Sequence, residues 1–283
     1  MKDHLFRKYG TILGTTISPI SIFALRYYEK NYGKTLRSIP KNGKTLEIGP
    51  GSASFTQYLL QKGYEDITVC EIADDSARAL GQFFGDRIRV IHRDVIDYLE
   101  SAPDRFDFIF AAQVIEHFAY DDLLRFLQNC YASLNDGGYI ILETINCANV
   151  IYGSYLRYCD YSHRMGFTPR SLKQFLSMAG NFSSLEFIEI QPTGFLDCLH
   201  YIYHRIKRNN MVTKNQTVTR PNFPGAQRGP KRLLALLLRT PGVRLSRWLS
   251  ALFMGYYEFE KIRIYTPFFA IAARKACIGV RDD

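Results

Sequence analysis

The stretch Thr45-Leu46-Glu47-Ile48-Gly49-Pro50-Gly51 decides the fold of this chain. Its first four residues form a short run typical of a buried strand, and a helical pattern over Ser54–Gln61 follows the two glycines. Glycine lets the backbone turn sharply and approach a ligand closely. Amides at the start of a helix then face the ligand. A ligand-binding loop between a strand and a helix is therefore predicted.

Apolar runs alternate with amphipathic helical patterns from Lys44 to about Ile190. Nearly continuous hydrophobicity in such runs is typical of strands buried on both faces of a parallel sheet. We expect strands at Thr45–Ile48, Ile67–Cys70, Ile88–Ile91, Phe106–Ala111, Tyr139–Glu143, Leu185–Ile190 and Pro267–Arg274, and helices at Ser54–Gln61, Asp75–Phe84, Asp94–Glu100, Asp121–Leu134 and Pro169–Ala179. This order predicts an α/β fold with a doubly wound, seven-stranded, mostly parallel sheet.

The pattern divides the chain into four parts. Residues 1–43 are expected to form an N-terminal helical arm, residues 44–192 a ligand-binding core, residues 193–265 a basic amphipathic helical insertion, and residues 266–283 the final strand that completes the core sheet. Within the insertion, the polar stretch Asn209–Gln227 contains Pro221, Pro224 and Gly225, and it is expected to be a loop.

Composition limits the classes of partner and compartment. The net charge is +9 and the pI about 9.2, which favours either an acidic partner or a basic solvated surface. The six cysteines include no Cys-x-x-Cys pair, which argues against a zinc ribbon and favours a reducing cytoplasm. No run reaches the roughly 18 apolar residues that span a bilayer.

The residues around Gly49-Pro50-Gly51, which we call the glycine loop, distinguish between two classes of ligand. Glu71 follows the second expected strand, where an acid accepts hydrogen bonds from ribose hydroxyls. The dinucleotide fingerprint requires a third Gly or Ala, but Ser54 stands at that place. Glu47 would repel a pyrophosphate and suits the ammonium of an aminoacyl group. These features favour a methyltransferase over a nicotinamide enzyme.

The segment Glu47–Gly51 resembles the first motif of class I S-adenosylmethionine-dependent methyltransferases. This resemblance implies S-adenosylmethionine as the cofactor and a Rossmann-like sheet. Glu71 is similar to the ribose-binding acid of that family, Asp94 to the acid that meets the adenine amine, and Gln113 to the segment beside the methionine portion. Asp94 also suits the N-cap of a helix. The expected cofactor-binding residues are Glu47, Gly49, Gly51, Glu71, Asp94 and Gln113.

The acceptor side is expected at the loops that follow the fourth and fifth strands. Glu116 and His117 are expected to open the helix after the fourth strand, where they either cap and pack the helix or take part in catalysis. His117 and His163 are both candidates for a general base, because imidazole titrates near neutrality. Glu116, His117 and His163 are the expected catalytic residues.

A metal site is not expected from the sequence. The segment Gln113-x-x-Glu116-His117 resembles a Glu-x-x-Glu-His segment that supplies magnesium or manganese ligands in ubiquinone-pathway O-methyltransferases and in small-RNA 2′-O-methyltransferases. The RNA enzymes add a later histidine, as His163 would here. Gln113 departs from that pattern, because an amide is a weaker ligand than a carboxylate for a hard cation.

A second resemblance concerns the acceptor. The segment Asp160–Arg164, followed by Phe167–Leu172, is similar to a segment of methyltransferases of bacterial cell-surface glycan biosynthesis, in which the usual form is Asp-Pro-Thr-His. It implies O-methylation of a sugar hydroxyl on a nucleotide-linked or lipid-linked glycan. Four tyrosines either stack on a sugar or form a packed lid: Tyr152, Tyr155, Tyr158 and Tyr161. The alternatives are a quinone or small aromatic acceptor, and a non-catalytic assembly module of a glycan-synthesis complex.

Residues 195–261 combine basic and aromatic residues with long apolar faces. Arg239, Arg244 and Arg247 beside Trp248 and Phe253 suit a helix that lies on an anionic membrane surface. A packed cap and a homodimer interface are the alternatives. Nucleic acid is not expected as a partner, because no run of Lys and Arg or RNA-binding module is present. The expected location is the cytoplasm, with peripheral attachment to the inner membrane face.

Overall fold

The computed structural model describes residues 16–101, 104–149, 153–190 and 268–277. The expected insertion over residues 193–265 lies outside the described residues, and so do residues 1–15 of the expected arm over residues 1–43.

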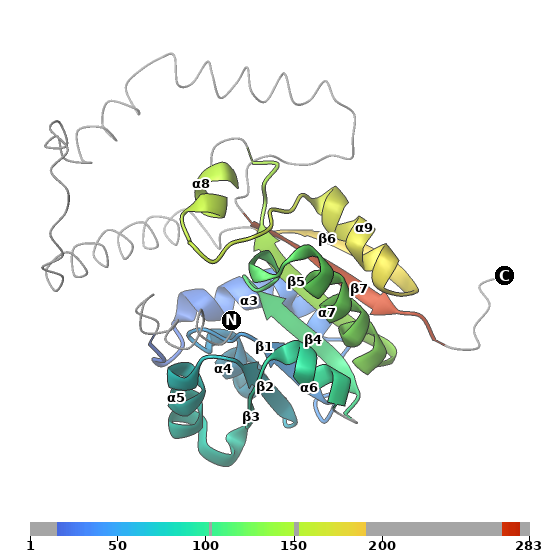
Figure 1. Cartoon of the computed structure of the whole chain (residues 1–283). Coiled ribbons are helices and arrows are strands. Elements are labelled where there is room, and N and C mark those ends of the chain that lie inside the picture. The colour runs from blue at the N-terminus through green and yellow to red at the C-terminus, as the bar shows by residue number, and fades with distance from the viewer. Residues whose placement is uncertain (1–15, 102–103, 150–152, 191–267, 278–283) are drawn as a thin grey trace, which may run out of the picture. The chain divides into compact units, whose positions relative to one another are not determined.

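A seven-stranded sheet forms the centre of the described structure (Figure 1). The strand order is β3-β2-β1-β4-β5-β7-β6, with β1 to β5 parallel and β7 antiparallel to both of its neighbours. The strands are β1 (Thr45–Ile48), β2 (Ile67–Glu71), β3 (Arg89–His92), β4 (Phe106–Ala112), β5 (Leu134–Ile145), β6 (Phe182–Glu189) and β7 (Phe268–Lys275). The predicted doubly wound α/β fold is confirmed.

Helices cover both faces of the sheet because successive residues of its buried strands point to opposite sides. One apolar core packs α6, α7 and α9 on the sheet, and the other packs α3, α4 and α5 on the opposite face. The helices are α3 (Ile22–Leu36), α4 (Ser54–Gln61), α5 (Asp74–Phe84), α6 (Val95–Ser101), α7 (Tyr120–Ser133), α8 (Gly153–Tyr158) and α9 (Pro169–Ala179), with short 3-10 turns η1 (Gly85–Arg87) and η2 (Ile115–His117). In β5, Ile140 and Leu142 face the first core and Ile141 faces the second.

Two expectations about local structure are wrong. Glu116 and His117 lie in the separate turn η2 and not at the start of α7, which begins at Tyr120. Asn135-Asp136-Gly137-Gly138 reads as a turn between the expected helix Asp121–Leu134 and the expected strand Tyr139–Glu143, but in the structure it is part of β5, which runs from Leu134. Leu134 pairs with Phe106, and the register then shifts before Phe108, so the strand continues through an irregular segment.

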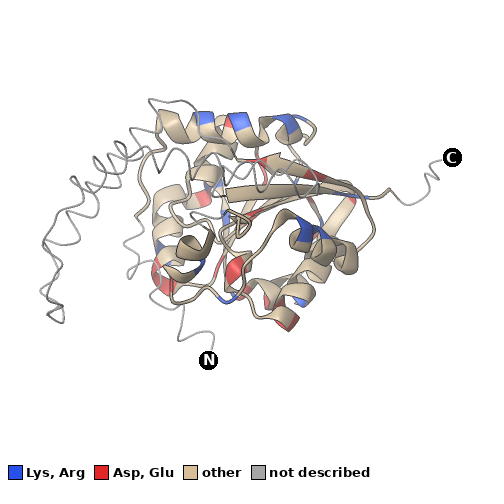
Figure 2. Ribbon diagram, turned by 90° about the horizontal axis from the view of Figure 1, so that it is seen from above, with Lys and Arg blue, Asp and Glu red and all other residues tan. Residues whose placement is uncertain are grey.

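Helix α3 belongs to the packed core. Tyr32 is fully buried, and its ring lies edge-on to Phe110 of β4 with 5.3 Å between centroids. Lys and Arg of the described residues are spread over several outer helices (Figure 2). Within the described part of the chain, no helix is long and apolar enough to span a bilayer.

Candidate active site

The glycine loop lies at the carboxyl end of β1, at the edge where the parallel strands end together (Figure 1). Gly49 and Gly51 both have positive φ, at 61° and 54°, a conformation that favours glycine. The Gly49 amide donates to the Cys70 carbonyl at 3.0 Å, and a Cβ on Gly49 would lie 2.8 Å from a Val114 methyl. A Cβ on Gly51 would meet nothing within 4 Å. Gly49 therefore packs against the segment after β4, while Gly51 borders open space.

Backbone strain is concentrated at the same edge. Ala53 and Gln113 are the non-glycine residues with positive φ in the described ranges, at 55° and 57°. Gln113 is held by Glu143, whose carbonyl accepts from the Gln113 amide at 3.0 Å and whose carboxylate accepts from the Gln113 side chain at 3.4 Å. Such strain persists only where the surrounding structure enforces it, and it is typical of functional sites.

The structure places the three predicted acids at the ends of β1, β2 and β3. Glu47 is buried and accepts a hydrogen bond from the Thr56 hydroxyl, and burial raises its pKa to about 8. Glu71 accepts from the Ala73 amide at 2.8 Å, and burial raises its pKa as well. Asp94 accepts from the Ile96 amide at 2.8 Å, so it caps α6 as expected.

A further buried carboxylate, Glu143 of β5, lies near the carboxyl ends of the parallel strands and was not predicted from the sequence as a site residue. Glu143 of β5 is 7 % exposed and accepts hydrogen bonds from the hydroxyls of Tyr27, at 2.9 Å, and Tyr32. Burial raises its pKa, while the two tyrosine hydrogen bonds oppose that shift. The available signal was an acid that ends the apolar run Tyr139-Ile-Ile-Leu-Glu143. The tyrosines carried no such signal, because α3 is distant from β5 in the sequence.

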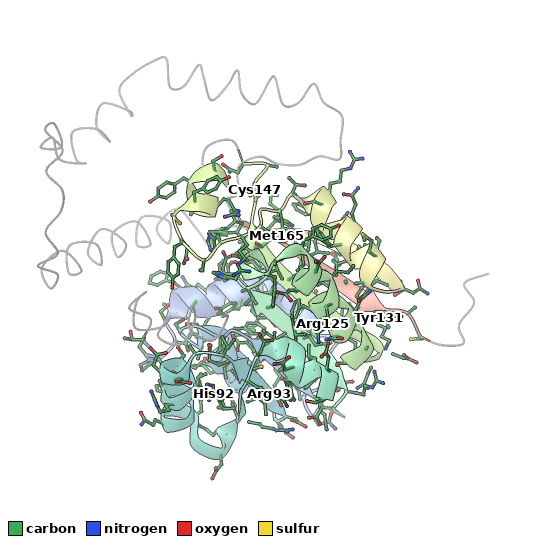
Figure 3. The ribbon with its side chains drawn as sticks, viewed as in Figure 1. His92, Arg93, Arg125, Tyr131, Cys147 and Met165 are labelled. Atoms are coloured by element: carbon green, nitrogen blue, oxygen red, sulfur yellow. The ribbon has the colours of Figure 1, made fainter. Side chains whose placement is uncertain are left out.

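The predicted acceptor-side residues come together. The Glu116 carbonyl accepts from the amides of Arg164 and Met165, at 2.8 and 3.0 Å, and this bond pair holds the loop of His163 against η2. The rings of His117 and His163 lie with centroids 4.8 Å apart. Cys147 and Met165 mark this region at the end of β5 (Figure 3). We call the side chains of Glu116, His117 and His163 the acceptor cluster.

Burial sets the electrostatics of the acceptor cluster. Glu116 is 1 % exposed, and its Oε2 accepts from the Thr144 hydroxyl at 3.0 Å. Its Oε1 is buried and has no hydrogen-bond partner among the described residues. Burial raises the pKa of Glu116 to about 7. Burial first, and His163 second, lower the pKa of His117 to about 4, so His117 is neutral at pH 7.

Asp160 and Ser162 orient His117, and neither was singled out from the sequence as a site residue. The Ser162 hydroxyl donates to Asp160 Oδ1 at 2.5 Å and lies 2.9 Å from His117 Nδ1. Because a hydroxyl has one proton, Nδ1 of His117 is the donor to Ser162. His163 Nδ1 lies 3.1 and 3.2 Å from the carbonyls of Leu156 and Arg157, which only accept. Both rings therefore carry a proton on Nδ1.

Aromatic side chains stand next to the acceptor cluster. Tyr155 and Tyr158 of α8 and Tyr161 of the following loop are 60 %, 78 % and 59 % exposed. Tyr152 lies outside the described residues. The three described tyrosines are not buried in a packed lid, and large exposed rings beside a site are typical of a binding surface.

The residues of this edge suit S-adenosylmethionine. Glu47 of β1 and Glu143 of β5 are buried acids on strands that flank β4, and Glu71 is buried at the end of β2, the other neighbour of β1. A ligand with a sulfonium and an ammonium group complements such acids, while its ribose hydroxyls suit Glu71. The open space at Gly51 admits a ligand close to the backbone.

Known proteins support this interpretation. The model of a methyltransferase domain family matches residues 22–181. The chain is 24% identical to N-terminal Xaa-Pro-Lys N-methyltransferase 1-B of Xenopus laevis over 144 residues. This aligned region covers 50% of this chain and 62% of that protein. It thus spans less than two thirds of that relative.

Solved structures share the fold. A SAM-dependent methyltransferase from Archaeoglobus fulgidus superposes with a TM-score of 0.56 at 17% identity, over 89% of this chain and 94% of that one. Phosphoethanolamine N-methyltransferase 2 of Haemonchus contortus, in complex with S-adenosyl-L-methionine, gives a TM-score of 0.53 at 18% identity, over 89% and 56%. The chain therefore belongs to the methyltransferase domain family, with its Rossmann-like fold and with S-adenosylmethionine as its cofactor.

Proposed function

We propose that this protein transfers a methyl group from S-adenosylmethionine to a sugar hydroxyl on a nucleotide-linked or lipid-linked glycan. The observation that carries the proposal is the acceptor cluster beside the glycine loop. Val114, which packs on Gly49, directly precedes η2, which carries Glu116 and His117. A hydroxyl that approaches the cluster is thus near the cofactor loop, as an in-line transfer requires.

The cofactor supplies a methyl group on a sulfonium, so a C–O bond forms as the C–S bond breaks and the hydroxyl proton leaves. The chain has two tasks in this reaction. Gly49, Gly51, Glu71 and Glu47 hold the cofactor side, and the acceptor cluster lowers the free-energy cost of removing the hydroxyl proton. Asp160 acts as a positioning residue, because its hydrogen bond to Ser162 fixes the ring of His117.

The exposed tyrosines support a sugar as the acceptor. Tyr155 and Tyr158 of α8, and Tyr161 of the loop that leads to His163, offer exposed aromatic faces and hydroxyls. The C–H face of a sugar ring packs on an aromatic ring, and the sugar hydroxyls bond to polar groups around it. A glycan is a better match than a quinone for such an open surface, because a quinone would favour a closed apolar pocket.

An amine acceptor is the second candidate. Burial raises the pKa of three acids at this edge, Glu47, Glu116 and Glu143, and a cationic ammonium group beside them would favour their charged forms. The relatives from Xenopus laevis and Haemonchus contortus are both named as N-methyltransferases. An amine must also lose a proton before it accepts the methyl group, so the same cluster would serve.

Transfer of a labelled methyl group distinguishes these candidates. Purified full-length protein would be given methyl-labelled cofactor with a sugar nucleotide, a lipid-linked sugar, a catechol, a peptide with a free N-terminus, or phosphoethanolamine. We expect label on one of the sugars, as an ether that survives mild base. Label only on the peptide or phosphoethanolamine would replace the first proposal with the second, and label only on the catechol would contradict both.

A matched pair of variants ties the activity to the acceptor cluster. His163→Ala is expected to reduce transfer at least tenfold while its affinity for S-adenosylhomocysteine is unchanged. His92→Ala is the control, because His92 is half exposed and pairs with Asp74 at 3.0 Å. Full activity of His163→Ala would remove His163 from the acceptor site.

We also infer that residues 195–261 bind an anionic membrane, which would bring the enzyme to a lipid-linked acceptor. Their basic and aromatic composition supports this role. The protein should sediment with vesicles that contain phosphatidylglycerol and not with vesicles of phosphatidylcholine alone. Replacement of Arg239, Arg244 and Arg247 by Glu should abolish sedimentation, and retention by both kinds of vesicle would contradict an electrostatic attachment.

A further inference from the structure

The donor atoms of the acceptor cluster are arranged as in a cation site. Glu116, His117 and His163 offer one carboxylate oxygen and two imidazole nitrogens, and these atoms all lie within 4.8 Å of one another. A divalent cation about 2.1 Å from each ligand holds its ligand atoms about 3–4 Å apart. Small side-chain rotations would therefore bring all three residues onto one ion.

The unpartnered oxygen of Glu116 independently indicates a ligand. Oε2 is satisfied by Thr144, while the buried Oε1 has no hydrogen-bond partner in the described structure. Buried polar atoms without a partner are rare in folded proteins and cost stability. A cation in the cluster would satisfy Oε1.

The hydrogen bonds around the two histidines prepare their rings for a metal. The Ser162 hydroxyl oxygen accepts a hydrogen bond from Nδ1–H of His117. The carbonyls of Leu156 and Arg157 accept from Nδ1–H of His163. With the Nδ1 proton held in this way, Nε2 is the ring nitrogen that can bind a metal. Histidines that bind metals commonly have such a partner on the other nitrogen, which fixes the tautomer and the ring orientation.

The side chain of Gln113 does not join this group, because it bonds to Glu143. The main chain of Gln113 pairs with Glu143 and accepts a hydrogen bond from the His117 ring. A site of two histidines and one carboxylate therefore forms without a ligand at position 113. The weakness of an amide ligand, which argued against a metal in the sequence, does not apply to this set.

We propose that Glu116, His117 and His163 bind one divalent transition-metal cation, which coordinates the oxygen of the acceptor next to the cofactor loop. Two imidazole nitrogens favour Mn²⁺, Fe²⁺, Co²⁺ or Zn²⁺ over Mg²⁺, which prefers oxygen ligands. The cation polarises the acceptor hydroxyl, whose proton leaves to water before the oxygen takes the methyl group. This role rests on the proposed function, whereas metal binding itself does not.

Metal binding is tested on the full chain without any acceptor. Protein dialysed against EDTA and then freed of EDTA would be titrated with MnCl₂ and followed by electron paramagnetic resonance. We expect one Mn²⁺ per chain, displaced by Zn²⁺ and not by Mg²⁺ at equal concentration. Glu116→Gln and His163→Gln should each weaken Mn²⁺ binding at least tenfold. His92→Gln, which removes an exposed histidine outside the cluster, should leave it unchanged.

Circular dichroism and affinity for S-adenosylhomocysteine verify that each variant is folded. Equal Mn²⁺ affinity in wild type and Glu116→Gln, or the absence of any Mn²⁺ or Zn²⁺ binding by folded wild-type protein, would overturn the site. Full methyl transfer in EDTA would overturn its role in the reaction. Metal binding without transfer to any sugar would instead count against the proposed acceptor and leave the site intact.

Discussion

The imidazole rings of His117 and His163 lie 4.8 Å apart between centroids, although α7, β5 and α8 separate them in the sequence. Hydrogen bonds from the amides of Arg164 and Met165 to the Glu116 carbonyl create this contact. Backbone bonds of this kind do not depend on the side chains that they bring together. The loop that carries His163 is therefore tied to η2 by main-chain hydrogen bonds, in addition to any contact between the cluster side chains.

Ser162→Ala tests how His117 is oriented. The substitution removes the acceptor for His117 Nδ1 and the donor to Asp160, so we expect the turnover number to fall about 10- to 100-fold. Affinity for S-adenosylhomocysteine, measured by calorimetry, should not change. Ser162→Thr keeps the hydroxyl and should recover most of the activity. Equal turnover of the Ala and Thr variants would show that the hydroxyl is not needed.

Gly51→Ala and Gly63→Ala form a matched pair. Both glycines have positive φ, and a Cβ on either would meet nothing within 4 Å, so each substitution should cost about 1–2 kcal/mol of stability. Only Gly51 lies in the cofactor loop. We expect Gly51→Ala to weaken cofactor binding at least tenfold in calorimetry and Gly63→Ala to leave it unchanged. Equal affinities would contradict the assignment of the loop.

Tyr32→Phe should destabilise the protein by about 1–3 kcal/mol, because it removes a donor from the buried Glu143 carboxylate. Tyr58→Phe is the control. Its hydroxyl donates to Glu29, whose side chain is 42% exposed, so water can replace the lost hydrogen bond. Urea unfolding measures both changes. A Tyr32→Phe loss no larger than that of the control would mean that water reaches Glu143.

The buried Glu47 should make the stability of the ligand-free protein depend on pH. Its pKa is about 8 in the folded state, because of burial, and near 4.5 when exposed. Between these values the folded state binds a proton that the unfolded state has lost. The free energy of unfolding should therefore fall as pH rises, by at most about 1.4 kcal/mol per unit, and level off above pH 8.

Glu47→Gln isolates this contribution. Urea unfolding of wild type and variant at pH 6, 7 and 8 should show a shallower decline for Glu47→Gln, so the variant gains stability relative to wild type as pH rises. Other buried acids, such as Glu143, contribute equally to both proteins and cancel in the difference. Parallel curves for the two proteins would show that Glu47 does not hold a proton in the folded state.

The bounds of helices were predicted correctly where consecutive residues define them. Helices α4 and α9 have the predicted bounds, and in α9 the cap Thr168 with Pro169 defines where the helix begins. The start of β5 was missed because Gly137 and Gly138 read as a turn, whereas pairing of Leu134 with Phe106 extends the strand through them. Glu116 and His117 were expected to open a helix for a different reason: a short 3-10 turn and the first turn of a helix have similar sequence patterns.

The sequence by itself determined the alternation of strands and helices, the glycine loop and the acid that follows it, because strand periodicity and turn chemistry depend on neighbouring residues. Only the tertiary structure decided that Tyr32 meets Glu143 and that His163 meets Glu116. Those contacts depend on which strands lie side by side and on backbone bonds between distant loops. The order of the strands and the hydrogen bonds between distant loops are both fixed by packing of the whole sheet, so the pattern of neighbouring residues does not predict them.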